Sequence, residues 1–157
     1  MRTARLALEP LRVEHAREMV AVLADPRIYE FIGGAPPSED ELETAYARRV
    51  AHPGWLNWIV RADGVAIGVV QATVTGHVAE LAWVIAPAHQ GRGLATEAAR
   101  AVQEHLRAQG IAEFQAHIHP DHPASAAVAR RLGLEPTDVI QDGEVRWVGR
   151  SPAPRSP

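Results

Sequence analysis

A glycine-containing loop joins a strand directly to a helix in the middle of the chain, and this junction constrains the fold more than any other segment. The loop holds Gly91 and Gly93, an apolar run (78–85) precedes it, and a helical pattern follows without a linker. Glycines let the backbone approach a ligand with no Cβ in the way. The first amides of a helix have no intrahelical acceptor, and the helix dipole places partial positive charge there. We therefore expect an anion site at this junction that suits a pyrophosphate, with Arg92 adding a charge-assisted contact.

Two common phosphate-binding motifs do not fit this loop. A P-loop requires G-x-x-x-x-G-K-[ST], and the chain contains no lysine at all. A Rossmann fingerprint requires G-x-G-x-x-G after the first strand, whereas Gly91 and Gly93 lie in mid-chain after hairpins and are followed by Glu97. The lack of lysine also excludes a Schiff-base lysine. The lack of cysteine excludes a disulfide scaffold, a thiolate zinc site and a cysteine nucleophile.

Hydrophobic periodicity and turn residues divide the chain into alternating strands and helices. Strands are expected at 3–9, 56–62, 65–73, 77–85, 111–118, 134–140 and 144–148. Helices are expected at 13–24, 38–51, 94–109 and 123–132, with a helical turn at 28–32. Ser38 and Glu41 form a capping-box pattern, and Asp63-Gly64 is typical of a tight hairpin turn. This order predicts a mixed α/β sheet with packed helices in one domain (1–150), followed by a disordered tail (151–157).

Composition narrows the class of partner. Of the 157 residues, 46% are apolar and 22% are charged, which is typical of a globular domain, and the net charge is -3. A surface that binds nucleic acid usually carries a basic excess, so we expect no nucleic-acid partner. We find neither a signal-peptide core near Met1 nor an apolar run long enough to span a bilayer, so we expect a cytoplasmic protein with no membrane partner.

The loop pattern Gln90-x-x-Gly93-x-Ala95 resembles the acyl-CoA signature Q/R-x-x-G-x-G/A of the GCN5-related N-acetyltransferase (GNAT) family. The resemblance extends over about residues 3–149. Within the family, the chain is most similar to the subgroup that contains the ribosomal-protein N-terminal acetyltransferases. The segments that carry it are Leu8-Glu9-Pro10-Leu11, Asp25-Pro26, Phe31-Ile32-Gly33-Gly34, Ile67-Gly68, Ala79 to Ile85, and Ser125 to Leu134.

The resemblance implies the GNAT fold, a mostly antiparallel sheet whose fourth and fifth strands splay apart around acetyl-CoA. Pantetheine is then expected to pair with the backbone of the fourth strand, and the loop and first helical turn are expected to bind the pyrophosphate. The cofactor-binding residues expected on this basis are Trp83, Val84, Ile85, Gln90, Gly91, Arg92, Gly93, Leu94, Ala95 and Thr96. This chemistry needs no metal ion. His117, His119 and His122 are expected to be histidines of the cleft edge or the surface, and we do not expect them to bind a metal.

The same resemblance implies direct attack of a primary amine on the thioester, which requires a base and a proton donor. Glu80 is the expected base, because its strand neighbours are apolar and burial among them raises the pKa of a carboxyl. A buried glutamate paired with an arginine is the alternative. Ser125 is the expected proton donor, or it orders pantetheine; a serine that bonds its own helix start is the plainer reading. His122 stands where the family usually has asparagine, and it is a candidate for binding pantetheine or moving a proton.

The acceptor is not readable from the sequence. Protein N-termini and small-molecule amines such as aminoglycosides, polyamines and amino acids remain open. Transfer of another acyl group, such as succinyl, and a non-catalytic CoA-binding or sensory role are the alternatives to acetyl transfer. Family members often form dimers, so a homodimer is an expected partner.

Overall fold

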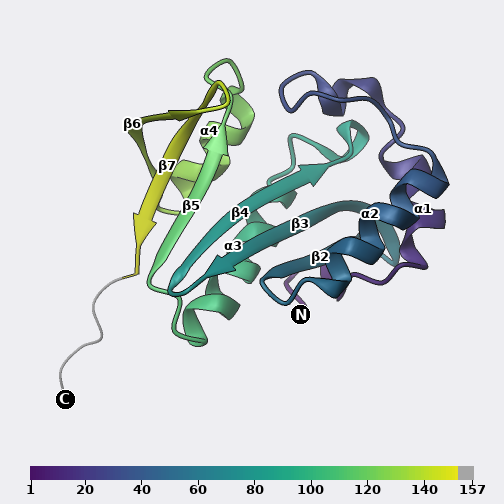
Figure 1. The fold of residues 1–157 in the computed structure, drawn as a ribbon, viewed down its shortest axis with the longest axis horizontal. Helices are drawn as coiled ribbons and strands as arrows, with labels where there is room; N and C mark the ends of the chain where they lie inside the picture. Colours follow the sequence, from purple (N-terminus) through teal and green to yellow (C-terminus); the bar gives the residue numbers. More distant parts are fainter. Residues whose placement is uncertain (152–157) are drawn as a thin grey trace.

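A seven-stranded sheet with helices on both faces forms the centre of the molecule (Figure 1). The computed structural model describes residues 1–151. The strands run in the spatial order β1-β2-β3-β4-β5-β7-β6. Their bounds are β1 Ala7–Pro10, β2 Trp55–Ala62, β3 Val65–Thr75, β4 Val78–Ile85, β5 Glu113–Ile118, β6 Glu135–Gln141 and β7 Glu144–Arg150. The helices are α1 His15–Val22, α2 Glu39–Ala51, α3 Leu94–Ala108 and α4 Pro123–Arg131, with short 3-10 turns η1 Pro26–Tyr29 and η2 Pro87–His89.

Local sequence signals set most of these boundaries. Asp63 and Gly64 both have positive φ, at 50° and 78°, so they form the tight turn that pairs β2 with β3. The capping box predicted at the start of α2 is present, with Ser38 Oγ accepting from the Glu41 amide and the Glu41 carboxylate accepting from the Ser38 amide. The predicted fold class, a mixed and mostly antiparallel sheet with flanking helices, is confirmed.

The helices cover opposite faces of the sheet and bury two apolar cores. α3 and α4 pack against β3, β4 and β5, and the core there includes Leu81, Val102 and Phe114. α1 and α2 pack against β2 and β3, where the smaller core includes Met19 and Tyr46. In Figure 1, α2 crosses in front of β2 and β3 while α3 lies behind the sheet. Because α1 and α2 pack on β2 and β3, no helix of residues 1–151 covers β4 and β5 on that front face.

The sheet opens where its one parallel pair ends. β4 and β5 pair only at Val78, Ala79 and Glu80 of β4, and the five residues that follow in β4 have no partner strand on that side. The two strands then diverge, as Figure 1 shows. The whole length of β4 pairs with β3, so β4 remains part of the half of the sheet formed by β1, β2 and β3. β5 pairs with β7, and β7 with β6, so these three strands form the half that diverges from it. The splay expected from the sequence is thus confirmed.

The first strand is shorter than the sequence predicts. The strand expected at 3–9 begins at Ala7, because residues before it form a turn in which the Thr3 amide donates to the Leu6 carbonyl at 2.9 Å. The tail expected to be disordered lies outside the described residues except for Ser151, whose amide donates to the Ala112 carbonyl at 2.7 Å. Over residues 1–151, none of the helices combines the length and apolar character that a bilayer crossing requires.

Gly68 of β3 allows the closest backbone approach between β3 and the end of β4. A Cβ at this position would lie 2.1 Å from the Val84 carbonyl oxygen and 3.0 Å from the Ile85 Cα. Backbone atoms cannot give way as a side chain does, so we expect Gly68→Ala to destabilise the fold by about 3 kcal/mol. For a domain of this size that lowers the melting temperature by about 6–12 °C in calorimetry.

Gly54→Ala is the matched control for this measurement. Its Cβ would meet the Val74 carbonyl oxygen at 3.0 Å, which a shift of a few tenths of an ångström relieves. The lower entropy of the unfolded chain offsets much of that cost, so the expected change is within about 1 kcal/mol. Equal melting temperatures for the two variants would contradict the close approach at Gly68.

Candidate functional site

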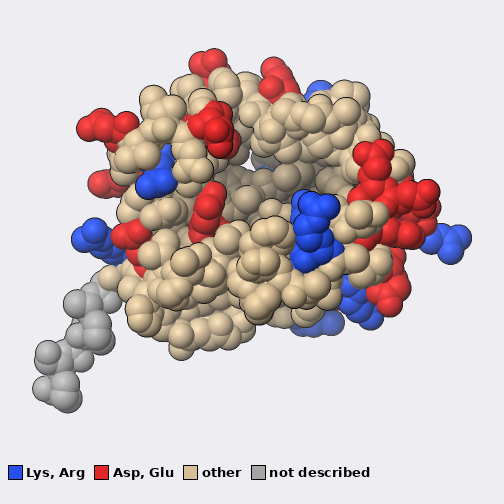
Figure 2. All heavy atoms as spheres, viewed as in Figure 1, with Lys and Arg blue, Asp and Glu red and all other residues tan. Residues whose placement is uncertain are grey.

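A cleft of about 1130 Å³ lies where β4 and β5 part. Its walls come from β4, the loop that follows it, the start of α3, the end of β5, the first turn of α4, and α2 with the segment before it. Figure 2 shows the hollow on this face, with acidic side chains bordering it on the side of β4 and β5. Of the site residues predicted from the sequence, those that line the cleft are Glu80, Trp83, Val84, Ile85, Gln90, Gly91, Gly93, Leu94, Ala95, Thr96, His122 and Ser125.

The glycine loop has the backbone that its sequence predicts. Gly91 and Gly93 adopt left-handed conformations, with φ of 78° and 76°, which side-chain-bearing residues rarely adopt. Gly93 is the N-cap of α3 and has no side chain to cap the helix. The first turn of α3 therefore opens onto the cleft with its amides unsatisfied.

Six consecutive backbone N–H groups, from Gly91 to Thr96, have no acceptor among residues 1–151. The Glu97 amide is the first that bonds within the helix, to the Gly93 carbonyl at 3.1 Å. The Thr96 hydroxyl is also buried without a hydrogen-bond partner. A run of free donors at a helix N-terminus suits an anion such as a phosphate.

Gln90 and Arg92 lie differently from their neighbours in the loop. The Gln90 side-chain amide donates to the Ile85 carbonyl at 2.8 Å, so it holds the loop against the end of β4. The Arg92 side chain is exposed and does not line the cleft, and its carbonyl accepts from Arg5 at 2.9 Å. Arg92 thus belongs to the site through its backbone amide, which is one of the six without an acceptor, and the charge-assisted contact expected of its side chain stays a prediction.

An N-terminal strap, formed by Thr3 and Arg5, supports the outer side of the loop. It was not predicted from the sequence. Arg5 Nε donates to Glu97 Oε1 at 2.8 Å, and the Thr3 hydroxyl donates to Glu97 Oε2 at 2.5 Å. Burial raises the pKa of Glu97, but these hydrogen bonds outweigh it and keep that pKa below its ordinary value. A carboxylate in the first turn of α3 also suits the helix dipole. The contacts join residues more than ninety positions apart, so no local pattern signals them.

The edge of β4 beyond Glu80 forms the floor of the cleft. No strand pairs with residues 81–85 on the β5 side, and Trp83 and Val84 are half-buried there. A free strand edge offers alternating amides and carbonyls to an extended ligand. The Ile85 carbonyl on this edge is already bonded by Gln90, and the Val84 carbonyl points the other way, toward Gly68 of β3. Trp83, two residues before Ile85, therefore holds backbone groups that remain on this edge.

Glu80 is exposed to the cleft instead of buried among apolar side chains. Its side chain is 47% exposed, so the burial from which we expected a raised pKa is not found. Glu80 Oε1 lies 2.8 Å from Nδ1 of His117. Arg146 Nε donates to His117 Nε2 at 3.1 Å, and this nitrogen must therefore accept. His117 thus donates from its Nδ1–H to Glu80 and accepts from Arg146 on its other ring nitrogen.

Glu144 is a second carboxyl of the cleft that the sequence analysis did not single out. It begins β7 and is half-buried. Burial raises the pKa of Glu144, against the nearby histidines His117 and His119, which lower it. The environment expected around Glu80 is therefore found at this residue. The only sequence signal was its place directly after the Asp142-Gly143 turn.

His122 and Ser125 meet at the start of α4. Ser125 Oγ lies 3.5 Å from His122 Nε2, at the outer limit of a hydrogen bond. The His122 ring stacks on Phe31 with centroids 4.5 Å apart. Burial lowers the pKa of His122, and the neighbouring His119 lowers it further, so this ring is neutral at pH 7.

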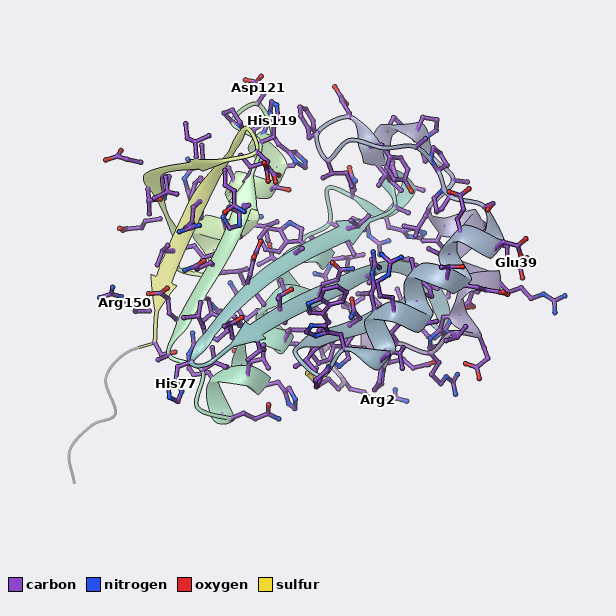
Figure 3. The ribbon with its side chains drawn as sticks, in the orientation of Figure 1. Arg2, Glu39, His77, His119, Asp121 and Arg150 are labelled. Atoms are coloured by element: carbon purple, nitrogen blue, oxygen red, sulfur yellow. The ribbon has the colours of Figure 1, made fainter. Side chains whose placement is uncertain are left out.

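Phe31 also joins the two rims of the cleft. Its ring lies 5.5 Å from that of His119, and Figure 3 shows His119 and Asp121 at the tip of the loop between β5 and α4. The three histidines 117, 119 and 122 all line the cleft. Residues 1–151 contain no group of three or more His, Asp or Glu side chains arranged to hold a metal ion.

The chain is similar to known acetyltransferases in sequence and in fold. The family model of the acetyltransferase (GNAT) domain matches residues 5–135. Mycothiol acetyltransferase from a Nocardioides species is 34% identical over 123 residues, which cover 78% of this chain and 37% of that protein. The chain therefore spans little more than a third of the length of that curated relative.

Solved structures repeat the fold over nearly the whole chain. RimL, the ribosomal L7/L12 alpha-N-protein acetyltransferase in complex with coenzyme A, has a TM-score of 0.83 at 16% identity and covers 94% of this chain and 95% of its own. The microcin C7 self-immunity acetyltransferase MccE in complex with acetyl-CoA and AMP has a TM-score of 0.81 at 16% identity and covers 95% and 94%. Because the family model covers most of its length, this chain belongs to the acetyltransferase (GNAT) domain family.

Proposed function

We propose that the protein is an N-acetyltransferase that moves an acetyl group from acetyl-CoA to a primary amine. The observation that carries the proposal is the run of six unpaired N–H donors beside the free edge of β4. A diphosphate is an anion of the size that such a run of donors accommodates. RimL and MccE, which share the fold, were solved with coenzyme A and acetyl-CoA. We extend the proposal to a cytoplasmic location and to a single domain over 1–150.

The residues present fit coenzyme A in two places. The amides of Gly91 to Thr96 would hold the diphosphate, with the buried Thr96 hydroxyl as a further donor. The free edge of β4 at Trp83 would pair with the amides of pantetheine, and Val84 lines the cleft beside it. Acetyl-CoA supplies a thioester whose carbonyl carbon accepts a neutral amine. Leu94 and Ala95 contribute their backbone and line the cleft, while Gln90 positions the loop.

The side chains of the cleft supply the proton transfers. Glu80 takes a proton from the amine, directly or through a water, and its exposed carboxylate suits a relay. The His117 Nδ1–H fixes the orientation of that carboxylate, with Arg146 behind it. As the new C–N bond forms and the C–S bond breaks, Ser125 gives a proton to the departing sulfur. His122, neutral and next to Ser125, restores that proton from solvent.

Two other functions are alternatives to acetyl transfer, and both would use the same binding site for CoA. In one, another acyl group such as succinyl is transferred; in the other, the chain binds CoA without catalysis. The relatives differ in acceptor by name, since one is a mycothiol acetyltransferase and another acts on a protein N-terminus. We therefore propose the primary amine as the reacting group, and either a small molecule or a protein N-terminus as its carrier.

Amide hydrogen exchange tests the diphosphate site directly. In the protein without ligand, we expect the amides of residues 91–96 to exchange fast and those of residues 98–106 to be protected. Coenzyme A should slow the exchange of residues 91–96 by at least tenfold, because the diphosphate oxygens become their acceptors. Pantetheine, which lacks the diphosphate, is the control and should leave these amides unchanged. Binding of coenzyme A with no slowing there, or no binding at all, would contradict the site.

Release of CoA thiol in the presence of an amine panel tests the catalytic assignment. We expect Glu80→Gln to lower kcat by roughly 10²- to 10⁴-fold with unchanged affinity for coenzyme A, because a general base contributes about that much. Ser125→Ala should lower kcat as well. Glu135→Gln removes an exposed carboxyl of β6 outside the cleft and serves as the matched control.

Glu144→Gln distinguishes Glu80 from Glu144 as the base. Loss of turnover in that variant with full turnover in Glu80→Gln would move the base to Glu144. Coenzyme A binding without turnover of any amine would favour the non-catalytic reading.

A further inference from the structure

An unpaired arginine lies in the wall of the cleft that α2 forms. Arg49 lines the cleft and is half-buried, and its guanidinium has no ion pair or side-chain hydrogen bond with any residue in 1–151. Within the described part of the chain, the guanidinium lies over the face of the Tyr46 ring, whose centroid is 5.7 Å from Arg49 Cζ. Burial lowers the pKa of Arg49, yet an arginine stays charged at any physiological pH. The wall therefore presents a fixed positive charge with free donors.

The surroundings of Arg49 do not compensate that charge. Ala45 and Leu42, about one and two turns earlier on α2, line the same wall, and Val69 lines it from β3. A half-desolvated cation among apolar side chains is costly without a partner. The Tyr46 hydroxyl is itself buried without a hydrogen bond, and burial raises its pKa to about 12, so it offers no negative charge.

The acidic groups of the cleft are engaged elsewhere or lie on other elements. Glu41 caps its own helix through the Ser38 amide, and it precedes Arg49 by eight residues, or about 12 Å along α2. Glu80 is bonded to His117, and Glu144 belongs to β7 on the opposite side. The other arginine of this wall, Arg27, is already paired with Asp25 at 2.6 Å. Arg49 is thus the cation of the α2 wall that is free for a ligand.

A role in stabilising the helix does not explain the position of Arg49. Cations in the last turn of a helix favour its dipole, and Arg48 and Arg49 both lie in the last turn of α2. Arg48 serves that purpose from the exposed side of the helix and does not line the cleft. Glu39 marks the outer end of α2 in Figure 3, and the helix runs from there across the sheet, so its last turn lies over the strands.

We propose that Arg49 binds an oxyanion, a carboxylate or a phosphate, on the acceptor, so that the substrate class is an amine that also carries a negative group. This inference rests on the proposed function and narrows it. A guanidinium takes either oxyanion in a bidentate hydrogen-bonded pair. The amine then faces the β4 and β5 side of the cleft, where Glu80 lies, and the anionic group faces α2. Arg49 acts here as a specificity-determining residue that contacts the substrate away from the reacting atoms.

Matched acceptors test the proposal in the CoA-release assay. Each amino acid or amino phosphate in the panel is paired with a neutral analogue, the amide of the carboxylate or the dimethyl ester of the phosphate, which is a neutral triester. For the wild-type protein we expect kcat/KM for the anionic member to exceed that of its neutral partner roughly 10- to 100-fold, the range of a charge-assisted pair. The carboxylate and phosphate arms distinguish the two sources of the oxyanion.

Arg49→Gln should remove this preference by raising KM for the anionic acceptor roughly 10- to 100-fold, with little change for the neutral one. Arg49→Lys should restore part of it, because a lysine keeps the charge but not the fork of donors. Arg48→Gln is the control and should change neither. A structural role for Arg49 would lower the melting temperature and affect both acceptors alike.

The outcomes separate the two proposals. Turnover with equal kcat/KM for anionic and neutral acceptors, or a preference that survives Arg49→Gln, overturns the inference and leaves the acetyltransferase proposal standing. A panel in which no amine is turned over overturns both.

Discussion

The short parallel pairing between β4 and β5 is the constraint on which the rest of the structure depends. Only Val78 to Glu80 of β4 pair with β5, although the sheet continues on both sides. Backbone groups without partners are costly inside a protein, so a sheet that opens in this way must expose them to solvent or to a ligand. The cleft, its free β4 edge and the open first turn of α3 all follow from that parting.

Long-range contacts hold this open arrangement in place. Gln90 closes the last carbonyl of β4, while Arg5 and Thr3 fix Glu97 at the start of α3. The loop is thereby supported from behind, and the six amides from Gly91 to Thr96 keep no acceptor among residues 1–151. Preorganised donors of this kind bind an anion without spending free energy on ordering the loop.

The polar groups of the cleft fall on two sides with different surroundings. On the β4 and β5 side, Glu80, His117 and Arg146 form a connected chain in which each side chain orients the next. On the α2 side, Arg27 and Glu41 are paired with Asp25 and the Ser38 amide, and Arg49 has no ion pair among residues 1–151. Carboxylates on one side and a cation on the other match a substrate with a positive and a negative end. This asymmetry comes from side chains on β4, β5, β7 and α2, which no single motif contains.

The amino-acid sequence by itself determined the local structure and the family. The Asp63-Gly64 turn, the Ser38 capping box and the left-handed Gly91 and Gly93 depend on neighbouring residues, and each was predictable from its pattern. The order of strands and helices, the splay implied by the resemblance and the GNAT membership followed in the same way.

Only the tertiary structure decided which side chains meet and how much water reaches them. Glu80 shares a strand face with apolar residues, which predicted burial, yet the cleft leaves it exposed and buries Glu144 instead. The pair of Glu80 with His117 and the strap from Arg5 to Glu97 join residues 37 and 92 positions apart. Burial and long-range pairing depend on how the elements pack, and the period of a strand or helix reports only the residues within that element.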